Sequence, residues 1–432
     1  MFSVISLGCS KNLVDTEKLI GMINDAGYDA YLDPEQIETS VVVVNTCGFI
    51  GDAKQESIDI LLQLAKLKSD ENSPLQTIVV MGCLSERYRE ELKTEIPEID
   101  FIYGKYDWVK LIDDFRLGKI EPDPSYHRTT RTQTTPSHYA YLKIAEGCNR
   151  ACSYCAIPII TGKYKSRTIE DIVEEAQYLV STGVKELQII AQDLTYYGID
   201  LYKENKLAEL VERLADIPGV KWLRLHYAYP RQFPYDLLRV MREKENVCAY
   251  LDLALQHSSE HMLKVMRRGI TKEEMETLIT QIRNEVPNIH LRTTLMVGHA
   301  DETEEDFKDL MDFVRRMRFE RMGAFMYSEE EGTYSAIHYE DNVSEEEKQR
   351  RLEELMTLQE DIALEINREK IGKTLKVIID REEDDYYIGR TEYDSPEVDG
   401  EVLIKMKGQK MVIGEFYDVT ITDADAFDLY VN

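Results

Sequence analysis

The sequence predicts an α/β protein with an N-terminal parallel α/β domain, a central partial (β/α)6 barrel and a small all-β barrel at the C-terminal end. Short apolar strands alternate with amphipathic helices over residues 1–120 and again over residues 138–370, which is typical of parallel sheets covered by helices. Residues 371–432 instead show short alternating strands without helical periodicity. We therefore expect three domains at these ranges and a linker at 121–137.

Composition and charge limit the possible functions. The chain has 432 residues, 43% of them hydrophobic, which is enough for several cores. No apolar run approaches twenty residues, and Met1 leads directly into a strand pattern, so we expect a cytoplasmic protein without a membrane segment. The formal net charge of −29 argues against nucleic acid as a direct substrate and favours a basic protein partner.

The N-terminal domain is predicted from its apolar segments. The strand FSVISL precedes a helix in DTEKLIGMINDAG, which a glycine ends. The strands TSVVVV and TIVVM flank a helix through IDILLQLAKL. Because their Val and Ile runs are nearly continuous, we expect these strands to be buried on both faces.

The cysteines form two groups of three. Cys9, Cys47 and Cys83 each follow a predicted strand of the N-terminal domain, and the carboxyl ends of parallel strands meet at one edge of a sheet. We expect these thiols to bind an iron–sulfur cluster. The alternative is three unrelated buried thiols, since Cys is among the most buried residue types. Seven cysteines in such a chain argue against a disulfide framework, and Cys248 is expected to be a small buried apolar side chain.

The second group of cysteines lies in the segment EGCNRACSYCAIP. Cys148, Cys152 and Cys155 can hold three irons of a [4Fe–4S] cluster and leave the fourth iron open to a small molecule. The alternatives are a zinc knuckle or a disulfide pair. Structural zinc takes four closed ligands, however, and no His or Cys lies just downstream to complete such a set.

The segment at 117–137 carries three prolines and many polar residues, which indicates a linker or a segment that covers the active site. Six strand candidates follow it, and helical stretches separate them: YLKIA, ELQIIA, VKWLRLHY, AYLDLAL, IHLRTTLMV and ERMGAFMY. Such a series predicts a partial barrel with its site at the carboxyl ends of the strands. The cysteine triplet follows the first strand, as this arrangement requires.

Polar residues at the ends of the later strands are the candidates for binding cofactor and substrate. They are Gln192, Asp193, Arg224, His226, Gln256, His257, Arg292, Thr294, Tyr327 and Ser328. Arginine can pair with a carboxylate through a bidentate fork, while Gln and Asp can bond amino or ribose groups. The alternative for each is hydrogen bonding inside the barrel or solvation.

The C-terminal part begins with a long helix from Ser344 to about Ile371, which a capping box of Ser344 and Glu347 opens. Leu355, Leu358, Ile362 and Ile366 give it an apolar stripe that should pack on the barrel. The pattern after it predicts a small five-stranded barrel. Residues 371–432 hold seven Lys and Arg against fifteen Asp and Glu, so a basic protein suits this barrel better than a phosphate backbone.

The chain resembles the radical S-adenosylmethionine (SAM) methylthiotransferase family over essentially its whole length. The similarity is carried by the two cysteine triplets, by Tyr154 before the last cysteine, and by a C-terminal domain similar to TRAM. The segments SLGCSKNLVDTE, NTCGFI and EYDSPEVDG, with the pair Gln256–His257, are similar to the branch that modifies ribosomal protein S-twelve.

This resemblance implies an enzyme that adds a methylthio group to the β-carbon of an aspartate, with one SAM for the radical and another as methyl donor. It implies two [4Fe–4S] clusters, one on Cys148, Cys152 and Cys155 that cleaves SAM and an auxiliary one on the first triplet. Tyr154, Gln192, Asp193, Arg224, His226, Gln256 and Arg292 would bind SAM, although simple packing also explains Tyr154. A reductant such as flavodoxin or ferredoxin would supply electrons.

One segment departs from the family pattern. After the fifth barrel strand the family usually has a Gly-rich turn with Pro, whereas this chain reads VGHADET, with Ala300 and Asp301.

Two other functions stay open. One is the same chemistry on a tRNA adenosine, and the other is an iron–sulfur carrier or scaffold that hands clusters on.

Overall fold

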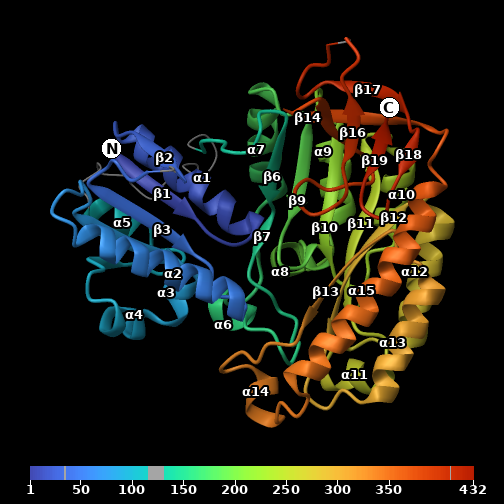
Figure 1. Ribbon diagram of the computed structural model, residues 1–432, viewed down its shortest axis with the longest axis horizontal. Coiled ribbons are helices and arrows are strands. Elements are labelled where there is room, and N and C mark those ends of the chain that lie inside the picture. The colour runs from blue at the N-terminus through green and yellow to red at the C-terminus, as the bar shows by residue number, and fades with distance from the viewer. Residues whose placement is uncertain (34–35, 115–130, 409) are drawn as a thin grey trace. The chain divides into compact units, whose positions relative to one another are not determined.

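The computed structural model describes residues 1–33, 36–114, 131–408 and 410–432 (Figure 1). Most of the predicted linker, residues 121–130, lies outside the described residues. The chain divides into two compact units. The first comprises residues 1–135, 141–149 and 156–178, and the second comprises residues 136–140, 150–155 and 179–432.

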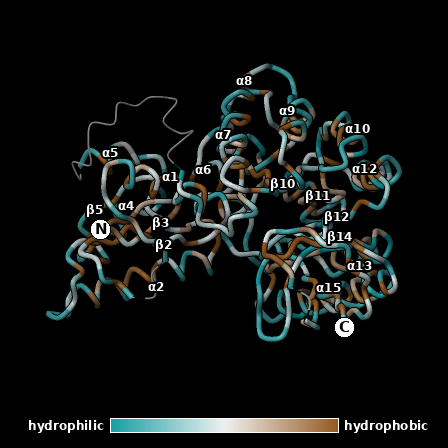
Figure 2. Tube along the Cα trace, turned by 90° about the horizontal axis from the view of Figure 1, so that it is seen from above, coloured by the Kyte–Doolittle hydropathy of each residue, from teal (hydrophilic) through white to brown (hydrophobic). Residues whose placement is uncertain are grey.

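The first unit contains the predicted parallel sheet, with five strands in the order β2-β1-β3-β4-β5. The strands are β1 (Phe2–Ser6), β2 (Ala30–Leu32), β3 (Val41–Thr46), β4 (Thr77–Gly82) and β5 (Phe101–Ile102). Alternate residues of β3 enter different cores, since Val43 packs with Phe2 and Leu19 while Val42 packs with Leu61. Strands β3 and β4 are therefore buried on both faces, as their Val runs predict, whereas the edge strands β2 and β5 are only partly buried. Figure 2 shows the hydropathy along the chain.

Helices α1 (Ser10–Asp25), α2 (Gly51–Lys68), α3 (Cys83–Arg87), α4 (Arg89–Glu95) and α5 (Trp108–Asp114) complete the sheet. Helix α1 begins five residues before the predicted segment that starts at Asp15, because it follows Cys9 directly. It ends as predicted at a glycine, Gly27, which has a φ of +85° and donates its N–H to the Asn24 carbonyl at 2.9 Å. This unit also holds the short strands β7 (Ala145–Glu146) and β8 (Lys165–Ser166) and the helix α6 (Ile157–Thr161).

The central sheet has the six strands that the sequence predicts, in the order β13-β12-β11-β10-β9-β6. They are β6 (Tyr139–Lys143), β9 (Glu186–Ile190), β10 (Trp222–Ala228), β11 (Val247–Gln256), β12 (His290–Val297) and β13 (Arg321–Met326). Strands β9 to β13 pair in parallel with their neighbours. The helices that separate the strands are α7 (Ile169–Ser181), α8 (Ile199–Tyr202), α9 (Leu207–Ala215), α10 (Asp236–Glu243), α11 (Glu260–Val265), α12 (Lys272–Glu285) and α13 (Glu304–Met317). A 3₁₀ turn, η2, spans Leu194–Tyr196.

Two further helices, α14 (Tyr334–His338) and α15 (Glu345–Arg368), follow the last strand. Ser344 caps α15, because its Oγ accepts a hydrogen bond from the Glu347 backbone N–H at 3.3 Å. Only this half of the predicted capping box is described, because the Glu347 carboxylate binds Arg350 and Arg351 instead. Leu355 and Ile362 of the predicted apolar stripe are buried, whereas Leu358 and Ile366 are half-buried. The helix packs against β13, as the sequence predicts.

The C-terminal part is a curled mixed sheet of six strands in the order β17-β14-β15-β16-β19-β18. They are β14 (Thr374–Glu383), β15 (Tyr386–Thr391), β16 (Val402–Lys405), β17 (Phe416–Thr420), β18 (Asp423–Ala424) and β19 (Leu429–Val431). The pairs are antiparallel except β16 with β19, which is parallel. The sequence predicts five strands here. The additional strand arises because the last segment bends at residues 425–428 and forms the short β18 and β19.

Candidate active site

The first cysteine triplet follows three neighbouring strands, as predicted. Cys9 lies three residues after the end of β1, and Cys47 and Cys83 come directly after β3 and β4. The register pairs Ser6 with Asn45 and Thr46 with Gly82, so the three strands end at the same level. The structure therefore brings the three cysteine-bearing loops to one edge of the sheet.

Glycines allow these loops to approach closely. Gly8 has a φ of +90°, and a Cβ there would lie 2.7 Å from the Cys47 Sγ. A Cβ on Gly48 would lie 2.7 Å from the Leu84 backbone, directly after Cys83. Only glycine fits at either position, because both distances are far below van der Waals contact. These two contacts link the first loop to the second and the second to the third.

Two buried asparagines fix the backbone of these loops. The Asn12 Nδ2 donates to the carbonyl of Leu7 at 2.8 Å and to that of Thr46 at 3.2 Å. The Asn45 Nδ2 donates in return to the Asn12 carbonyl at 3.0 Å. Because each asparagine satisfies carbonyls of a neighbouring loop, the cysteine backbones are held before any cofactor binds.

A buried cation, Lys105, lies near this triplet. Its side chain is 3% exposed, and its Nζ donates to the Asp15 carboxylate at 3.0 Å; Lys143 binds the same carboxylate. Loss of hydration raises the pKa of Cys83 to about 12, and the Lys105 charge opposes this shift. Loss of hydration also raises the pKa of Cys9, but Lys11, the Asn12 backbone N–H and Lys105 outweigh it and lower the pKa below its ordinary value. Positive charge thus opposes the loss of hydration at these thiols, but it outweighs that loss only at Cys9, since the pKa of Cys47 is raised as well.

The second triplet lies on one short loop. Gly147 precedes it with a φ of +72°, and a Cβ there would lie 2.2 Å from the Lys163 carbonyl oxygen. In the first unit, the Cys148 N–H donates to the Gly162 carbonyl at 3.2 Å. In the second unit, the Ser153 N–H donates to Met266 at 3.0 Å, and the Ser153 carbonyl accepts from the Ser335 N–H at 2.7 Å.

Among the described residues, no three His, Cys, Asp or Glu side chains converge as the ligands of a single metal ion. A [4Fe–4S] cluster needs a different arrangement. Its three cysteine ligands bind three different irons, so their sulfur atoms lie further apart than the ligands of a single metal ion. The donor sets, the close loops and the positive charge around the first triplet fit such clusters.

Arg268 contacts the second triplet and is a residue that the sequence reasoning missed. Its Nη1 lies 3.1 Å from the Cys152 Sγ and 3.1 Å from the Tyr154 hydroxyl, and the side chain is 3% exposed. The Tyr229 hydroxyl lies 3.6 Å from the same sulfur. The segment MLKVMRRG gave only a helix pattern, and no local signal indicates that its last arginine reaches a cysteine more than a hundred residues earlier.

Tyr154 itself has two roles in the structure. Its ring packs edge-on against His299, with the ring centroids 6.2 Å apart, among Met262, Met266 and Met296. Loss of hydration raises the pKa of its hydroxyl well above the ordinary value. The hydroxyl is therefore a neutral group that accepts a hydrogen bond from Arg268, and the packing role is present as well.

Three amides around the carboxyl halves of β9 and β11 have atoms without partners. Gln188, Gln192 and Gln256 each bury one amide atom that has no hydrogen-bond partner among the residues the structure describes. The Oε1 atom of Gln188 is hydrogen-bonded to the His226 Nε2 at 2.6 Å. Buried polar atoms are normally satisfied in a functional state. These three atoms are therefore available to a polar ligand, and they include the predicted Gln192 and Gln256.

Asp193 is engaged by protein groups. Its carboxylate accepts from the Arg150 Nε at 2.7 Å and from the Thr195 backbone N–H at 2.9 Å. The Arg150 guanidinium in turn lies over the Tyr229 ring, 4.3 Å from its centroid. Asp193 thus holds an arginine of the cysteine loop itself, because Arg150 lies between Cys148 and Cys152 in the chain.

Arg224 and Arg292 do not lie at the carboxyl ends of their strands, where the sequence analysis places them. Each is the third residue of its strand, β10 or β12. Arg224 is fully buried, and it bonds Glu186 at 2.9 Å and the Glu392 carbonyl at 2.6 Å. The alternation of a strand shows which face a residue occupies but not its height along the strand. We therefore propose no cofactor contact for either arginine.

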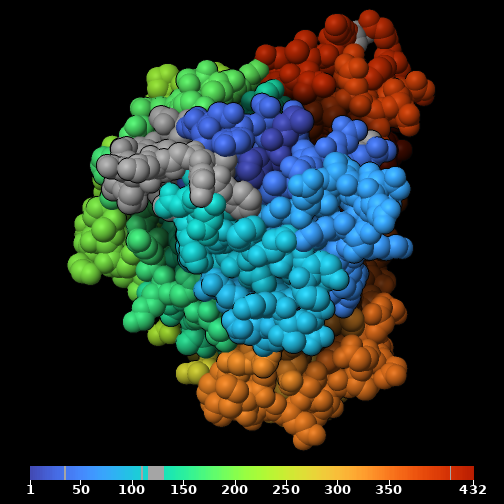
Figure 3. Space-filling view, turned by 90° about the vertical axis from the view of Figure 1, so that its left-hand side faces the viewer, coloured from blue at the N-terminus to red at the C-terminus, as the bar shows by residue number. Residues whose placement is uncertain are grey.

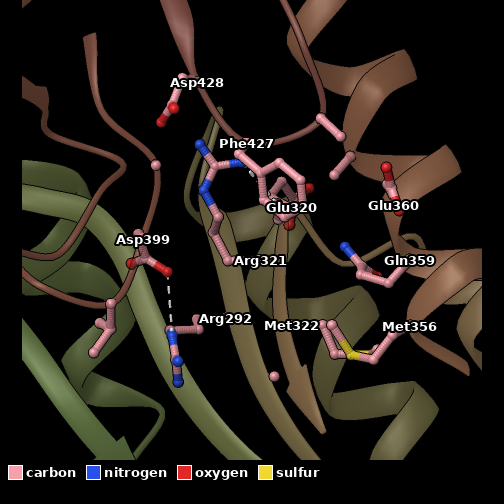
Figure 4. A pocket seen from close by; sticks show the side chains of 15 residues that line it. Arg292, Glu320, Arg321, Met322, Met356, Gln359, Glu360, Asp399, Phe427 and Asp428 are labelled. Atoms are coloured by element: carbon pink, nitrogen blue, oxygen red, sulfur yellow. Dashed lines mark hydrogen bonds and ion pairs between the residues drawn. The ribbon is translucent and has the colours of Figure 1, made fainter. Parts of the chain in front are cut away.

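Arg292 instead lines a pocket of about 360 Å³ near the amino ends of β12 and β13 (Figure 4). Its Nε donates to the Asp399 carboxylate at 3.2 Å, shown as a dashed line. Asp399 belongs to the segment EYDSPEVDG, and its other oxygen accepts from the Tyr250 hydroxyl at 2.9 Å. This segment thus serves to join the C-terminal sheet to the barrel strands.

The other predicted residues are buried or lie in loops after strands. The His257 Nδ1 accepts from the N–H groups of Ser258 and Ser259 at 2.9 and 3.0 Å, and its Nε2 lies 3.6 Å from the Glu302 carboxylate. The Thr294 hydroxyl lies 3.5 Å from the Arg292 Nη1. Tyr327 is buried against His299, and Ser328 is exposed.

The departing loop VGHADET is firmly held. Asp301 has a φ of +67°, in the left-handed region that a glycine would suit, and Asp tolerates this conformation better than most residues. Its N–H donates to the Asn342 Oδ1 at 3.0 Å, and Asn342 donates back to its carboxylate at 3.2 Å. The reciprocal bonds stabilise the turn at Asp301, where this chain has neither glycine nor proline.

None of the helices in the described part of the chain is both long and apolar enough to cross a membrane. Three family models match the sequence. Uncharacterized protein family UPF0004 matches residues 1–104, the Radical SAM superfamily matches residues 142–314, and the TRAM domain matches residues 371–432.

Solved structures support the fold. The radical S-adenosylmethionine methyltransferase TsrM from Kitasatospora setae aligns with a TM-score of 0.56 at 15% identity, over 78% of this chain and 74% of that chain. The cobalamin-dependent S-adenosylmethionine radical enzyme OxsB aligns with a TM-score of 0.52 at 12% identity, over 84% of this chain and 56% of that chain. The sheets, the cysteine triplet and the family matches together define a radical SAM enzyme.

Curated relatives are similar over nearly the whole length. "Ribosomal protein uS12 methylthiotransferase RimO" of Bacteroides thetaiotaomicron is 60% identical over 427 residues, which is 99% of this chain and 97% of the relative. The proteins of the same name from Phocaeicola vulgatus and Porphyromonas gingivalis are 60% and 58% identical, each over 99% of this chain and over 98% and 97% of the relative. The chain belongs to the RimO family of methylthiotransferases.

Proposed function

We propose that this protein adds a methylthio group to the β-carbon of an aspartate of small-subunit ribosomal protein uS12. The printed names of the full-length relatives support this substrate. The observation that carries the proposal is the placement of Cys9, Cys47 and Cys83 at one edge of a parallel sheet, in addition to the triplet of the radical SAM domain. A radical enzyme that inserts sulfur needs both a site for SAM and a nearby sulfur carrier.

Each triplet would hold one [4Fe–4S] cluster. Cys148, Cys152 and Cys155 would bind the cluster that meets SAM, and Cys9, Cys47 and Cys83 would bind the auxiliary cluster. Three ligands leave one iron of each cluster without a protein donor. When bound, the clusters and SAM supply the radical chemistry that an unactivated C–H bond requires and that ordinary acids and bases cannot provide.

The protein itself would orient these groups. The free amide atoms of Gln188, Gln192 and Gln256 are suited to the amino, carboxylate or ribose groups of SAM. Tyr154 presents an apolar ring and a neutral hydroxyl next to Cys152 and Cys155. Lys105 and Lys11 would place positive charge near the auxiliary thiolates.

A basic protein substrate suits the charge of this chain. The net charge is −29, and acidic residues prevail in the C-terminal sheet. A second acidic surface spans residues 328–341 of the loop around α14, in the orange region of Figure 3. It bears the exposed Ile337, and Ser335 ties it to the cysteine loop through Ser153. This surface would attract a cationic protein toward the radical site.

The remaining parts of the proposal follow the family. We propose functional domains at residues 1–120, 138–370 and 371–432, a cytoplasmic location, and a flavodoxin or ferredoxin as electron donor.

The test is anaerobic reconstitution with iron, sulfide, SAM and a reductant, followed by mass spectrometry of digested uS12 and of bulk tRNA. A methylthio gain on one aspartate of uS12 is expected, with none on tRNA. Cys152→Ala should abolish it, whereas Cys248→Ala, which alters a thiol buried among Trp222, Tyr250 and Ile378, should leave it intact. A gain on tRNA alone would overturn the choice of substrate.

A further inference from the structure

Arg268 is a buried arginine for which the structure describes no carboxylate partner. Among the described residues, its side chain contacts the Cys152 sulfur, the Tyr154 hydroxyl and the Ala254 carbonyl, and no Asp or Glu lies within ion-pair distance. A buried cation without a counter-charge is strongly destabilising unless an anion compensates it. The group that the geometry places beside it is the Cys152 sulfur, 3.1 Å away, which would carry negative charge as a ligand of a cluster.

The guanidinium is locked in place from several sides. The Tyr229 ring lies 4.2 Å from it, and the Tyr229 hydroxyl donates to the Arg268 carbonyl at 2.8 Å. A second arginine, Arg150, also lies over the Tyr229 ring, but Asp193 neutralises it through a 2.7 Å ion pair. Arg268 therefore supplies the uncompensated positive charge in the described surroundings of Cys152.

Its neighbour Arg267 also lies over a tyrosine ring, but it differs in burial and in its distance from the cysteine loop. Arg267 is exposed, and its guanidinium lies over the Tyr334 ring at 4.3 Å, away from any cysteine contact that the structure describes. One arginine is buried against Cys152 and the next is exposed. A comparison of variants at the two positions therefore separates the effect of the contact with Cys152 from the effect of losing one positive charge.

We propose that Arg268 is a positioning residue that donates a charge-assisted hydrogen bond to the Cys152 ligand and thereby raises the reduction potential of the SAM-binding cluster. The inference rests on the proposed function, because it requires a cluster at this triplet. One-electron reduction adds negative charge to the cluster and its thiolates. An N–H donor and a fixed cation beside a ligand sulfur stabilise the reduced form more than the oxidised form.

The bond to the Tyr154 hydroxyl extends this role. The same Nη1 atom contacts both the second cysteine of the triplet and the aromatic residue before the third. Arg268 thus also fixes the conformation of the loop between Cys152 and Cys155, where SAM would meet the open iron. A lysine would retain the charge but not the rigid fork.

The test uses the full-length reconstituted protein and the variants Arg268→Gln, Arg268→Lys and Arg267→Gln. Iron and sulfide per chain are measured first. A redox titration then follows, by electron paramagnetic resonance, the cluster signal that changes when SAM is added. Arg268→Gln should lower the ratio of reduced to oxidised cluster at a fixed potential about tenfold, which corresponds to about 59 mV for one electron. Arg267→Gln should match the wild type, and Arg268→Lys should lie between.

The outcomes separate the two proposals. A wild-type protein without a SAM-responsive cluster overturns the proposed function and this inference with it. A wild-type cluster whose potential is unchanged in Arg268→Gln at full iron content overturns the inference alone. If Arg268→Gln retains no iron, Arg268→Lys decides, because an absence of any shift in that variant would again contradict the role of the hydrogen bond.

Discussion

Replacement of Gly8 by alanine tests whether the first cysteine triplet forms one site. Gly8 has a φ of +90°, and the new Cβ would lie 2.6 Å from the Cys47 Cβ and 2.7 Å from its Sγ. Gly27 provides a matched control, since it has a similar φ of +85° but nothing within 4 Å of the added carbon. Both variants carry the backbone strain, and only one pushes on a cysteine.

The cost of the backbone strain and the cost of the clash with Cys47 can be assessed separately. A non-glycine residue in the left-handed region costs about 1–2 kcal/mol, and this applies to both variants. The clash forces Cys47 and its loop to move, and such overpacking costs about 1–3 kcal/mol more. Gly8→Ala should therefore lose about 2–5 kcal/mol of stability, against about 1–2 kcal/mol for Gly27→Ala.

The decisive assay is iron and sulfide per chain after anaerobic reconstitution, together with the midpoint of urea unfolding. Gly8→Ala should keep only about half of the wild-type iron, because the displaced Cys47 impairs the auxiliary cluster alone. Gly27→Ala should keep all of it. A Gly8→Ala protein with full iron content would refute the claim that these cysteines share one cluster.

Two further predictions concern the second unit. Glu186→Gln breaks a fully buried ion pair with Arg224 and Arg390, and it should lower stability by about 3–5 kcal/mol in urea unfolding. The exposed Glu243, paired with Arg239, gives the control Glu243→Gln, which should leave the midpoint unchanged; equal effects would contradict the importance of the buried pair. Burial lowers the pKa of His290 to about 3, so below pH 6.5 the unfolded chain binds a proton there that the folded protein does not. Stability should thus fall as the pH drops from 7 to 5, by up to about 2 kcal/mol from this group. His290→Phe, which keeps an aromatic ring next to Tyr393, should remove that part of the pH dependence, and identical slopes would show that His290 does not titrate in this way.

Some features of the site could be read from the sequence because chain topology determines them. Cys9, Cys47 and Cys83 follow three apolar runs, and parallel strands must end at the same edge. The prediction of six barrel strands and of the Ser344 cap is confirmed for the same kind of reason, since strand patterns and caps are local signals.

Other features depend on contacts between distant residues and could not be predicted. Arg224 is the third residue of β10, and its buried contacts are with Glu186 of β9 and with the carbonyl of Glu392, directly after β15. The role of Arg268 depends on Cys152, which lies 116 positions earlier in the chain.

The position of Lys105 after β5 could have been noticed, because it lies at the same sheet edge as Cys83.

The measurement that tests the central claim most directly is methylthio-aspartate formation on uS12 by Cys47→Ala, with 5′-deoxyadenosine measured in the same reaction. Two separate cysteine triplets require that this variant still cleaves SAM but transfers no methylthio group, while Cys248→Ala does both. Methylthiolation by Cys47→Ala at the wild-type yield would contradict the account.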